Sequence, residues 1–301
     1  MSIRNPVEWS VDQLTTAARS TAREVGRHRR HAAEGRHAPL PEVRRIRLAD
    51  LRDALARGAG DLGAKRADIF ALCLIYPLAG LILARAASGY GMLPLVFPLV
   101  SGFALIGPVA ALGLYEISRR REEGLAVSWK DVFGVVHAPG FGAIVVLSFG
   151  LLAVFVAWMI SAYAIFLVTL GPASPSSIAA FVRDVFTTRA GWAMIVAGVG
   201  VGFLFAVLVL TVSVASLPLL LDRDVGLAGA VTTSMRAVLA NPGPMAVWGM
   251  IVAGGLVLGA LPGLVGLIIV LPLLGHATWH LYRKLVEHDP GGAMSGPGPV
   301  V

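Results

Sequence analysis

The chain contains several predominantly apolar stretches that are long enough to cross a lipid bilayer as helices. A helix rises about 1.5 Å per residue, so a hydrocarbon core of about 30 Å needs roughly 20 predominantly apolar residues. Four stretches meet this requirement, near residues 69–87, 93–115, 143–170 and 192–221. With 56% hydrophobic and only 14% charged residues, the chain is too apolar for a soluble globule of its length. The sequence therefore predicts an all-α fold, a polytopic bundle of transmembrane helices.

A further apolar region, from Met245 to Tyr282, is too long for one ordinary span. The segment Gly259-Ala-Leu-Pro262-Gly263 near its middle is a turn signal, because proline and glycine end helices. We therefore predict two short spans, near 245–260 and 263–282. The bundle then has about six spans.

This division gives the chain three regions. Residues 43–286 form the six-span membrane domain, which includes the single cysteine, Cys73. Residues 1–42 are a basic cytoplasmic arm, expected to be partly disordered, and residues 287–301 are a Gly/Pro-rich tail, expected to be disordered. The arm lacks interleaved aromatic residues in its basic stretch, so its charges favour anionic inner-leaflet lipids over nucleic acid as a partner.

The basic residues are distributed unevenly about these spans. Residues 1–68 contain 14 of the 25 Lys and Arg, and residues 116–130 contain four more. With six spans these groups fall on the same side as Arg283-Lys284, whereas Arg183 and Arg189 fall on the other. Positive residues collect on the cytoplasmic side of membrane proteins. Both termini are therefore predicted to be cytoplasmic.

Short amphipathic helices are predicted in the cytoplasmic connections. Apolar residues recur at helical spacing in residues 128–136, where Ser128 and Asp131 have the spacing of a capping box. Similar apolar stripes occur in residues 48–62 and 227–238. Each of these helices is predicted to end at glycine or proline, the first at Gly58-Ala-Gly60, before the chain enters the membrane.

These helices suggest a repeated unit. An interfacial helix, a turn and two spans would occur three times, beginning near residues 43, 125 and 225; three unrelated interfacial helices are the alternative. Another amphipathic helix, near 178–185, is predicted on the external surface of the bilayer.

Three segments carry a resemblance to a known family. They are "SGFALIGPVAALGLYEISRRREEG" (101–124), "SLPLLLDRDVGLAGAVTTSMRAVLANPGPMAVWG" (216–249) and "LPLLGHATWHLYRKLV" (271–286). They resemble an uncharacterised family of bacterial integral membrane proteins, domain of unknown function 2189. The resemblance covers roughly residues 43–286 and implies a multi-pass protein of the bacterial inner membrane. It implies no activity, although some relatives carry a cytochrome c oxidase label.

The candidates for structural or interaction roles are small, polar or aromatic residues in these segments. They are Gly102, Gly107, Pro108, Gly113, Tyr115, Glu116, Arg119, Arg120, Asp222, Arg223, Asn241, Pro242, Pro272, His276, Trp279, His280 and Tyr282. We assign no catalytic, cofactor-binding or metal-binding residue.

The positions of the histidines test the cytochrome c oxidase label that some relatives carry. A haem–copper centre needs several histidines inside its spans, whereas only His276 and His280 of the seven lie near a predicted span. Their i, i+4 spacing would suit a metal ion. With Trp279 and Tyr282 beside them, however, they are more typical of side chains that lie among the headgroups.

Glu116 is the one acidic residue within the predicted spans. It precedes Arg119 and Arg120 by three and four residues, the spacing of ion pairs on a helix surface. It is predicted either to hold its helix end to a connection such as Asp222-Arg223-Asp224 or to be a solvated cap. The spans contain no carboxylate pair for intramembrane catalysis or proton coupling.

These observations favour a non-enzymatic scaffold or assembly partner. A permease for a small weakly polar or apolar solute is the alternative, and a haem- or metal-binding respiratory protein is a third class. The partner would be another membrane protein or a second copy of the chain. Gly198 with Gly202, and Gly255 with Gly259, have the spacing that lets helices pack closely, within one chain or in a homodimer.

Overall fold

The computed structural model describes residues 40–64, 85, 93–172, 177–262 and 264–287, and this part of the chain is all-α, as predicted. The predicted span near 69–87, Cys73, most of the arm and the tail from residue 288 lie outside the described residues. The elements are α2 (Leu48–Ala64), η1 (Leu93–Leu95), α5 (Val96–Ala110), α6 (Leu112–Glu122), η2 (Trp129–His137), α7 (Phe141–Thr169), α8 (Ile178–Thr187), α9 (Arg189–Ser213), α10 (Ser216–Asp222), α11 (Gly226–Ala240), α12 (Pro242–Ala260) and α13 (Leu267–Leu285).

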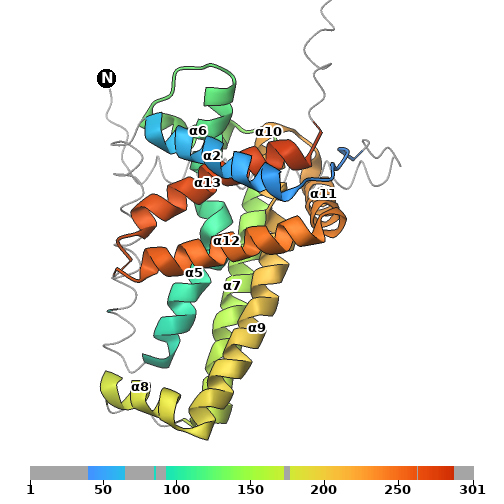
Figure 1. Cartoon of the computed structure of the whole chain (residues 1–301). Helices are drawn as coiled ribbons and strands as arrows, with labels where there is room; N and C mark the ends of the chain where they lie inside the picture. The colour runs from blue at the N-terminus through green and yellow to red at the C-terminus, as the bar shows by residue number, and fades with distance from the viewer. Residues whose placement is uncertain (1–39, 65–84, 86–92, 173–176, 263, 288–301) are drawn as a thin grey trace, which may run out of the picture.

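Helices α5, α7 and α9 lie side by side and form the elongated part of the molecule, which we call the stem (Figure 1). Trp158 of α7 joins the three helices. Its indole nitrogen donates to the carbonyl of Pro98 in α5 at 3.0 Å, and its ring lies 5.8 Å from that of Phe205 in α9. A Cβ on Gly102 of α5 would lie within 3.3 Å of Trp158. The stem is therefore packed around one buried aromatic side chain.

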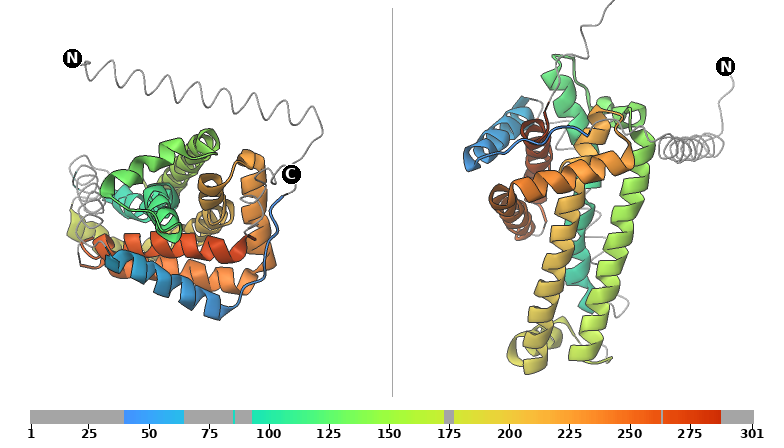
Figure 2. Two further views of the ribbon diagram at one scale, coloured as in Figure 1. Left: turned by 90° about the horizontal axis from the view of Figure 1, so that it is seen from above. Right: turned by 90° about the vertical axis from the view of Figure 1, so that its right-hand side faces the viewer.

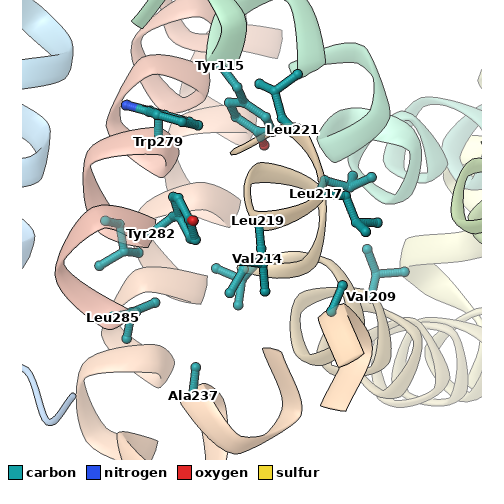
Figure 3. Close-up of a cluster of buried hydrophobic side chains, with 14 of the residues drawn as sticks. Tyr115, Val209, Val214, Leu217, Leu219, Leu221, Ala237, Trp279, Tyr282 and Leu285 are labelled. Carbon is teal, nitrogen blue, oxygen red and sulfur yellow. The ribbon is translucent and has the colours of Figure 1, made fainter. Parts of the chain in front are cut away.

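At one end of the stem lie α2, α6, η2, α10, α11 and α13, which we call the cap (Figures 1 and 2). The short helix α10 lies in the middle of the cap, and its apolar side chains contribute to the core shown in Figure 3, together with Trp279 and Tyr282 of α13. Leu217, Leu219 and Leu221 are all but fully buried. Since full burial of a leucine is worth about 1.5–3 kcal/mol, α10 contributes much of the stability of the cap.

Helix α8 lies across the opposite end of the stem (Figure 1). The hydroxyl of Ser177 accepts from the amide of Ala180 at 3.1 Å and caps α8, and that of Thr188 accepts from Gly191 at 2.9 Å and caps α9. The aromatic ring of Phe181 packs edge-on against Phe166 of α7. The helix predicted near 178–185 is therefore present and is fixed to the stem.

The predicted spans are only partly matched by long apolar helices. Three described stretches have the length and composition to cross a membrane: Phe141–Thr169, Arg189–Asp222 and Pro242–Ala260. The predicted span 93–115 is instead divided between α5 and α6. The predicted span 263–282 corresponds to α13, which runs across the stem beside α2 and α12 (Figures 1 and 2). The described helices thus form a stem with crossing helices at one end.

The segment predicted as a helix over 128–136 is the 3-10 helix η2. Its capping box is present, because the Ser128 hydroxyl accepts from the amide of Lys130 and Asp131 accepts from the amide of Ser128. A 3-10 helix has about three residues per turn, so Phe133 and Val136 both point outward and are exposed. The predicted capping is confirmed, but the helix type is not the one predicted.

The proposed threefold repeat does not share one architecture. Its interfacial elements are two α-helices, α2 and α11, and one 3-10 helix, η2. The long helices that follow also differ, since α7 and α9 run along the stem whereas α12 and α13 run across it (Figure 1). The similar local sequences therefore do not mark equivalent structural units.

Candidate functional site

The charged end of α6 is organised around Glu116, whose residue surface is only 1% exposed. Arg119 donates to both carboxylate oxygens at 2.8 Å, and Arg120 Nε donates to Oε1 at 2.7 Å. A carboxylate buried this deeply needs charged partners to offset its lost hydration. The predicted pairing of Glu116 with the two arginines is confirmed, and a solvated cap is not what the structure shows.

The element that covers this charged group is η2. A Cβ on Gly134 would lie 3.0 Å from the Glu116 carboxylate, and Arg120 pairs with Asp131 at 3.0 Å. The helix end that carries Glu116 is therefore held to a neighbouring connection, as predicted, but this connection is η2 and not the example given, residues 222–224.

A second group of polar side chains joins α2, α6 and α13, and we call it the Asp61 cluster: Asp61, Ser118, Arg121, His276 and His280. The Ser118 hydroxyl donates to Asp61 Oδ2 at 2.5 Å, and His280 Nε2 lies 2.8 Å from the same oxygen. Arg121 pairs with Asp61 Oδ1 at 3.0 Å. One carboxylate on α2 thus receives donors from α6 and from α13.

His276 is joined to the cluster through Ser118, at 2.8 Å from its Nδ1. A hydroxyl has a single hydrogen, and that of Ser118 is directed to Asp61, so the hydrogen-bond network assigns a proton to Nδ1 of His276. The Nε2 atom is fully buried and makes no hydrogen bond within the described part of the chain. The network therefore fixes which ring nitrogen carries the proton.

The pKa of Asp61 lies below its usual value. Burial alone would raise this pKa, but hydrogen bonds from His280 and Ser118 favour the carboxylate and outweigh burial. The cluster therefore contains a carboxylate at neutral pH.

The order of these groups does not suit nucleophilic catalysis. A Ser–His–Asp relay needs the imidazole between the hydroxyl and the carboxylate, whereas Ser118 lies between His276 and Asp61. Ser118 and His276 are also 0% exposed. Among the described residues, no three His, Cys, Asp or Glu side chains are grouped so as to hold a metal ion. The hydrogen bonds and ion pair of the Asp61 cluster hold α2, α6 and α13 together.

The rest of α13 makes further polar contacts with the cap. Trp279 Nε1 and Arg283 Nε donate to the two oxygens of Glu122 in α6, each at 3.0 Å, and the Tyr282 hydroxyl donates to Asp222 in α10 at 2.7 Å. Trp279 and Tyr282 are each 1% exposed. The interpretation of the α13 aromatic residues and histidines as headgroup side chains is therefore wrong, because they face other helices of the cap.

The two ends of the described chain are also joined here. Val43 and Val286 form an antiparallel bridge. Asn241 accepts from the amide of Ile46 at 2.7 Å and donates to the carbonyl of residue 44 at 3.1 Å. Arg223 donates to the carbonyl of residue 287 at 2.8 Å. The candidates Asn241 and Arg223 therefore hold the chain ends against the cap.

Two of the three candidate glycines lie at close contacts. A Cβ on Gly102 would lie 2.3 Å from the ring of Phe155 in α7, and one on Gly113 would lie 2.3 Å from the side chain of Val132 in η2. A Cβ on Gly107 would meet nothing within 4 Å in the described part of the chain. Gly102 and Gly113 therefore allow close packing of described helices.

The remaining candidates lie at helix breaks or in the core. Pro108 lies inside α5, which ends two residues later, and the chain restarts as α6 after Ala111. Proline lacks the amide that would bond to the carbonyl of residue 104, which weakens the last turns of α5. Pro242 is the first residue of α12, Pro272 is buried within α13, and Tyr115 is a buried residue of the cap core.

The sequence interpretation missed Asp61, Ser118 and Gly58. It took Gly58-Ala-Gly60 as a helix end, but α2 continues to Ala64. A Cβ on Gly58 would lie 2.7 Å from the backbone nitrogen of Ala277, so this glycine lets α2 and α13 touch. Asp61 follows Gly58 by three residues and so shares its helix face, but this spacing does not indicate which distant helix the face meets.

Together, the apolar stem and the cap held by buried charges define an all-α integral membrane protein. Residues 96–222 match the family described as "Predicted integral membrane protein (DUF2189)", which confirms the resemblance over that part of the chain. The matched region runs from α5 to α10 and includes the charged end of α6, but not α2 or α13. No curated protein matches the chain, and no solved structure does so.

Proposed function

We propose that the protein is a non-enzymatic scaffold of the bacterial inner membrane, in which the stem fixes the chain in the bilayer and the cap binds a membrane-protein partner. The observation that carries this proposal is that largely buried carboxylates of the cap are hydrogen-bonded to other side chains of the cap. Glu116, Asp61 and Asp222 all bond to side chains of the cap itself. Such contacts build a rigid platform and leave these groups unavailable for chemistry on a substrate.

The distribution of charge supports a cytoplasmic cap. The bridge between Val43 and Val286 requires both ends of the membrane domain to lie on one side of the bilayer. The arginines 119–121 and the pair Arg283-Lys284 lie in the same cap. Positive residues favour the cytoplasmic side, so the cap and both chain ends are assigned to that side.

The surface of the cap retains apolar side chains that a partner would cover. Leu48 of α2, Phe133 of η2 and Leu239 of α11 are 54%, 60% and 74% exposed, respectively. They lie on three separate elements of the cap. These three positions are where contacts with a partner are expected.

Site-specific photocross-linking in native membranes tests the proposal. A photoreactive phenylalanine analogue is placed singly at Leu48, Phe133 and Leu239, and at Phe203, an exposed residue of α9, as the matched stem control. A scaffold gives a protein adduct of defined mass from at least one cap position and none from Phe203. For a probe at Phe133, the nearby change Val136→Glu should abolish the adduct.

The mass of the adduct separates the two partners considered, because a second copy of the chain gives twice the mass of one. If cap and stem positions give the same adducts, or the cap gives none, the scaffold proposal fails. A permease would instead give no cap-specific adduct.

A further inference from the structure

Helix α12 has the composition of a membrane span but not its direction. In Figure 1 it runs across α7 and α9, and the view from above in Figure 2 shows α12 lengthwise while α7 and α9 are foreshortened. A helix that crosses two spans at a steep angle cannot cross the same bilayer along the same normal. Its apolar character therefore needs another explanation.

The contacts of α12 and α8 with α9 are separated by the thickness of a bilayer. A Cβ on Gly249 of α12 would lie 3.5 Å from the side chain of Leu210 in α9. At the other end of α9, α8 meets the stem at Arg189. The stretch of α9 between these two points is roughly 20 residues, or about 30 Å at about 1.5 Å per residue. That length matches the hydrocarbon thickness of a bilayer.

Charge is absent from the same interval and present beyond both of its ends. Residues 190–221 contain no Asp, Glu, Lys or Arg. Arg183 and Asp184 lie in α8 itself, and beyond α12 lie the paired charges of the cap, such as Glu116. The two crossing helices therefore mark the two faces of the hydrocarbon layer.

One face of α12 is apolar and uncovered. Its outward side chains include Met250, Val257, Leu258 and Leu261, which are between 61% and 74% exposed. They recur at helical spacing on a single face. The opposite side of α12 packs on α13, where a Cβ on Gly255 would lie 3.3 Å from Val270. The glycine pair Gly255 and Gly259 is thus used within the chain, while the outer face continues the apolar surface of the stem.

We propose that α12 lies flat in the interface of the cap-side leaflet, with Met250, Val257, Leu258 and Leu261 inserted among the lipid acyl chains. The occupant of this surface is the bilayer, because the surface is apolar, uncharged and continuous with the lipid-facing stem. Helix α8 lies correspondingly at the opposite leaflet. The hairpin of α12 and α13 is then attached to one leaflet and does not cross the membrane.

Nitroxide depth measurements on the full chain test this proposal. Single cysteines at positions 246, 250, 254, 257, 258 and 261, in a Cys73→Ala background, are spin-labelled and reconstituted in phosphatidylethanolamine–phosphatidylglycerol vesicles. Collision rates with oxygen and with a water-soluble nickel chelate give the depth of each label. Labels at 192, 196, 199, 203 and 207 of α9 are the matched control and should show depth rising and then falling along the helix.

A flat α12 gives labels at 250, 257, 258 and 261 that are all immersed at similar depth, with no trend along the helix. A depth that changes by about 1.5 Å per residue and passes through the bilayer centre would show that α12 is a span and overturn the proposal. Accessibility to the nickel chelate at all six positions would overturn it as well, because the face would then lie in water.

Discussion

Replacing Asp61 by alanine should destabilise the cap. The Asp61 carboxylate accepts from Ser118 at 2.5 Å and from His280 at 2.8 Å, and it pairs with Arg121 at 3.0 Å. Removing one partner of a buried charge pair costs about 3–5 kcal/mol. Because the Asp61 side chain is 12% exposed, water can replace some of these bonds, and a loss of about 3 kcal/mol is expected.

The assay is thermal unfolding of the purified full chain in mild detergent, followed by tryptophan fluorescence, since Trp279 lies buried in the cap. A loss of about 3 kcal/mol lowers the midpoint by roughly 6–12 °C in a domain of this size. Asp184→Ala is the matched control, because Asp184 is half exposed and pairs only loosely with Arg183 at 3.7 Å; its midpoint should hardly change. Equal midpoints for the two variants would refute the assigned role of the Asp61 cluster.

Three further predictions use the same protein. The pKa of Asp61 is lowered in the fold, so its stabilising effect is complete above the ordinary aspartate pKa of about 4 and is lost as pH falls below it; unfolding midpoints between pH 7 and pH 3 should fall less for Asp61→Asn than for the natural chain. Gly58→Ala should lower the unfolding midpoint because its Cβ would lie 2.7 Å from the α13 backbone, whereas Gly60→Ala, whose Cβ would meet no described residue within 4 Å, should leave it unchanged or slightly higher. A reporter active only outside the cytoplasm should be inactive when fused after Val286 and active when fused at Ser176; activity after Val286 would contradict a cytoplasmic cap.

Local features of the sequence predicted the parts of the fold that depend on neighbouring residues. The apolar stretch 143–170 corresponds closely to α7, because length and composition alone determine such a helix. The ion pairs of Glu116 and the capping box at Ser128 were also predictable, since each partner lies within four residues. The Asp61 cluster was not, because Asp61 and His280 are 219 residues apart in the chain. Nothing in local spacing indicates which distant helix a carboxylate will meet.

The error over α13 has a more specific physical cause. A helix that carries tryptophan, tyrosine and histidine near a basic end has the composition of a membrane-interface segment, and it has equally the composition of a helix whose amphipathic side chains bond to a neighbouring protein surface. The two cases differ in where the carboxylates lie. A membrane–water interface supplies no protein carboxylates. In this cap, Glu122 accepts from Trp279 and Asp222 accepts from Tyr282. Glu122 and Asp222 each lie shortly after a predicted span in the sequence. Their hydrogen bonds therefore connect α13 to the ends of those spans. Side chains that sequence composition assigns to lipid headgroups are thereby used to hold helices of the cap together.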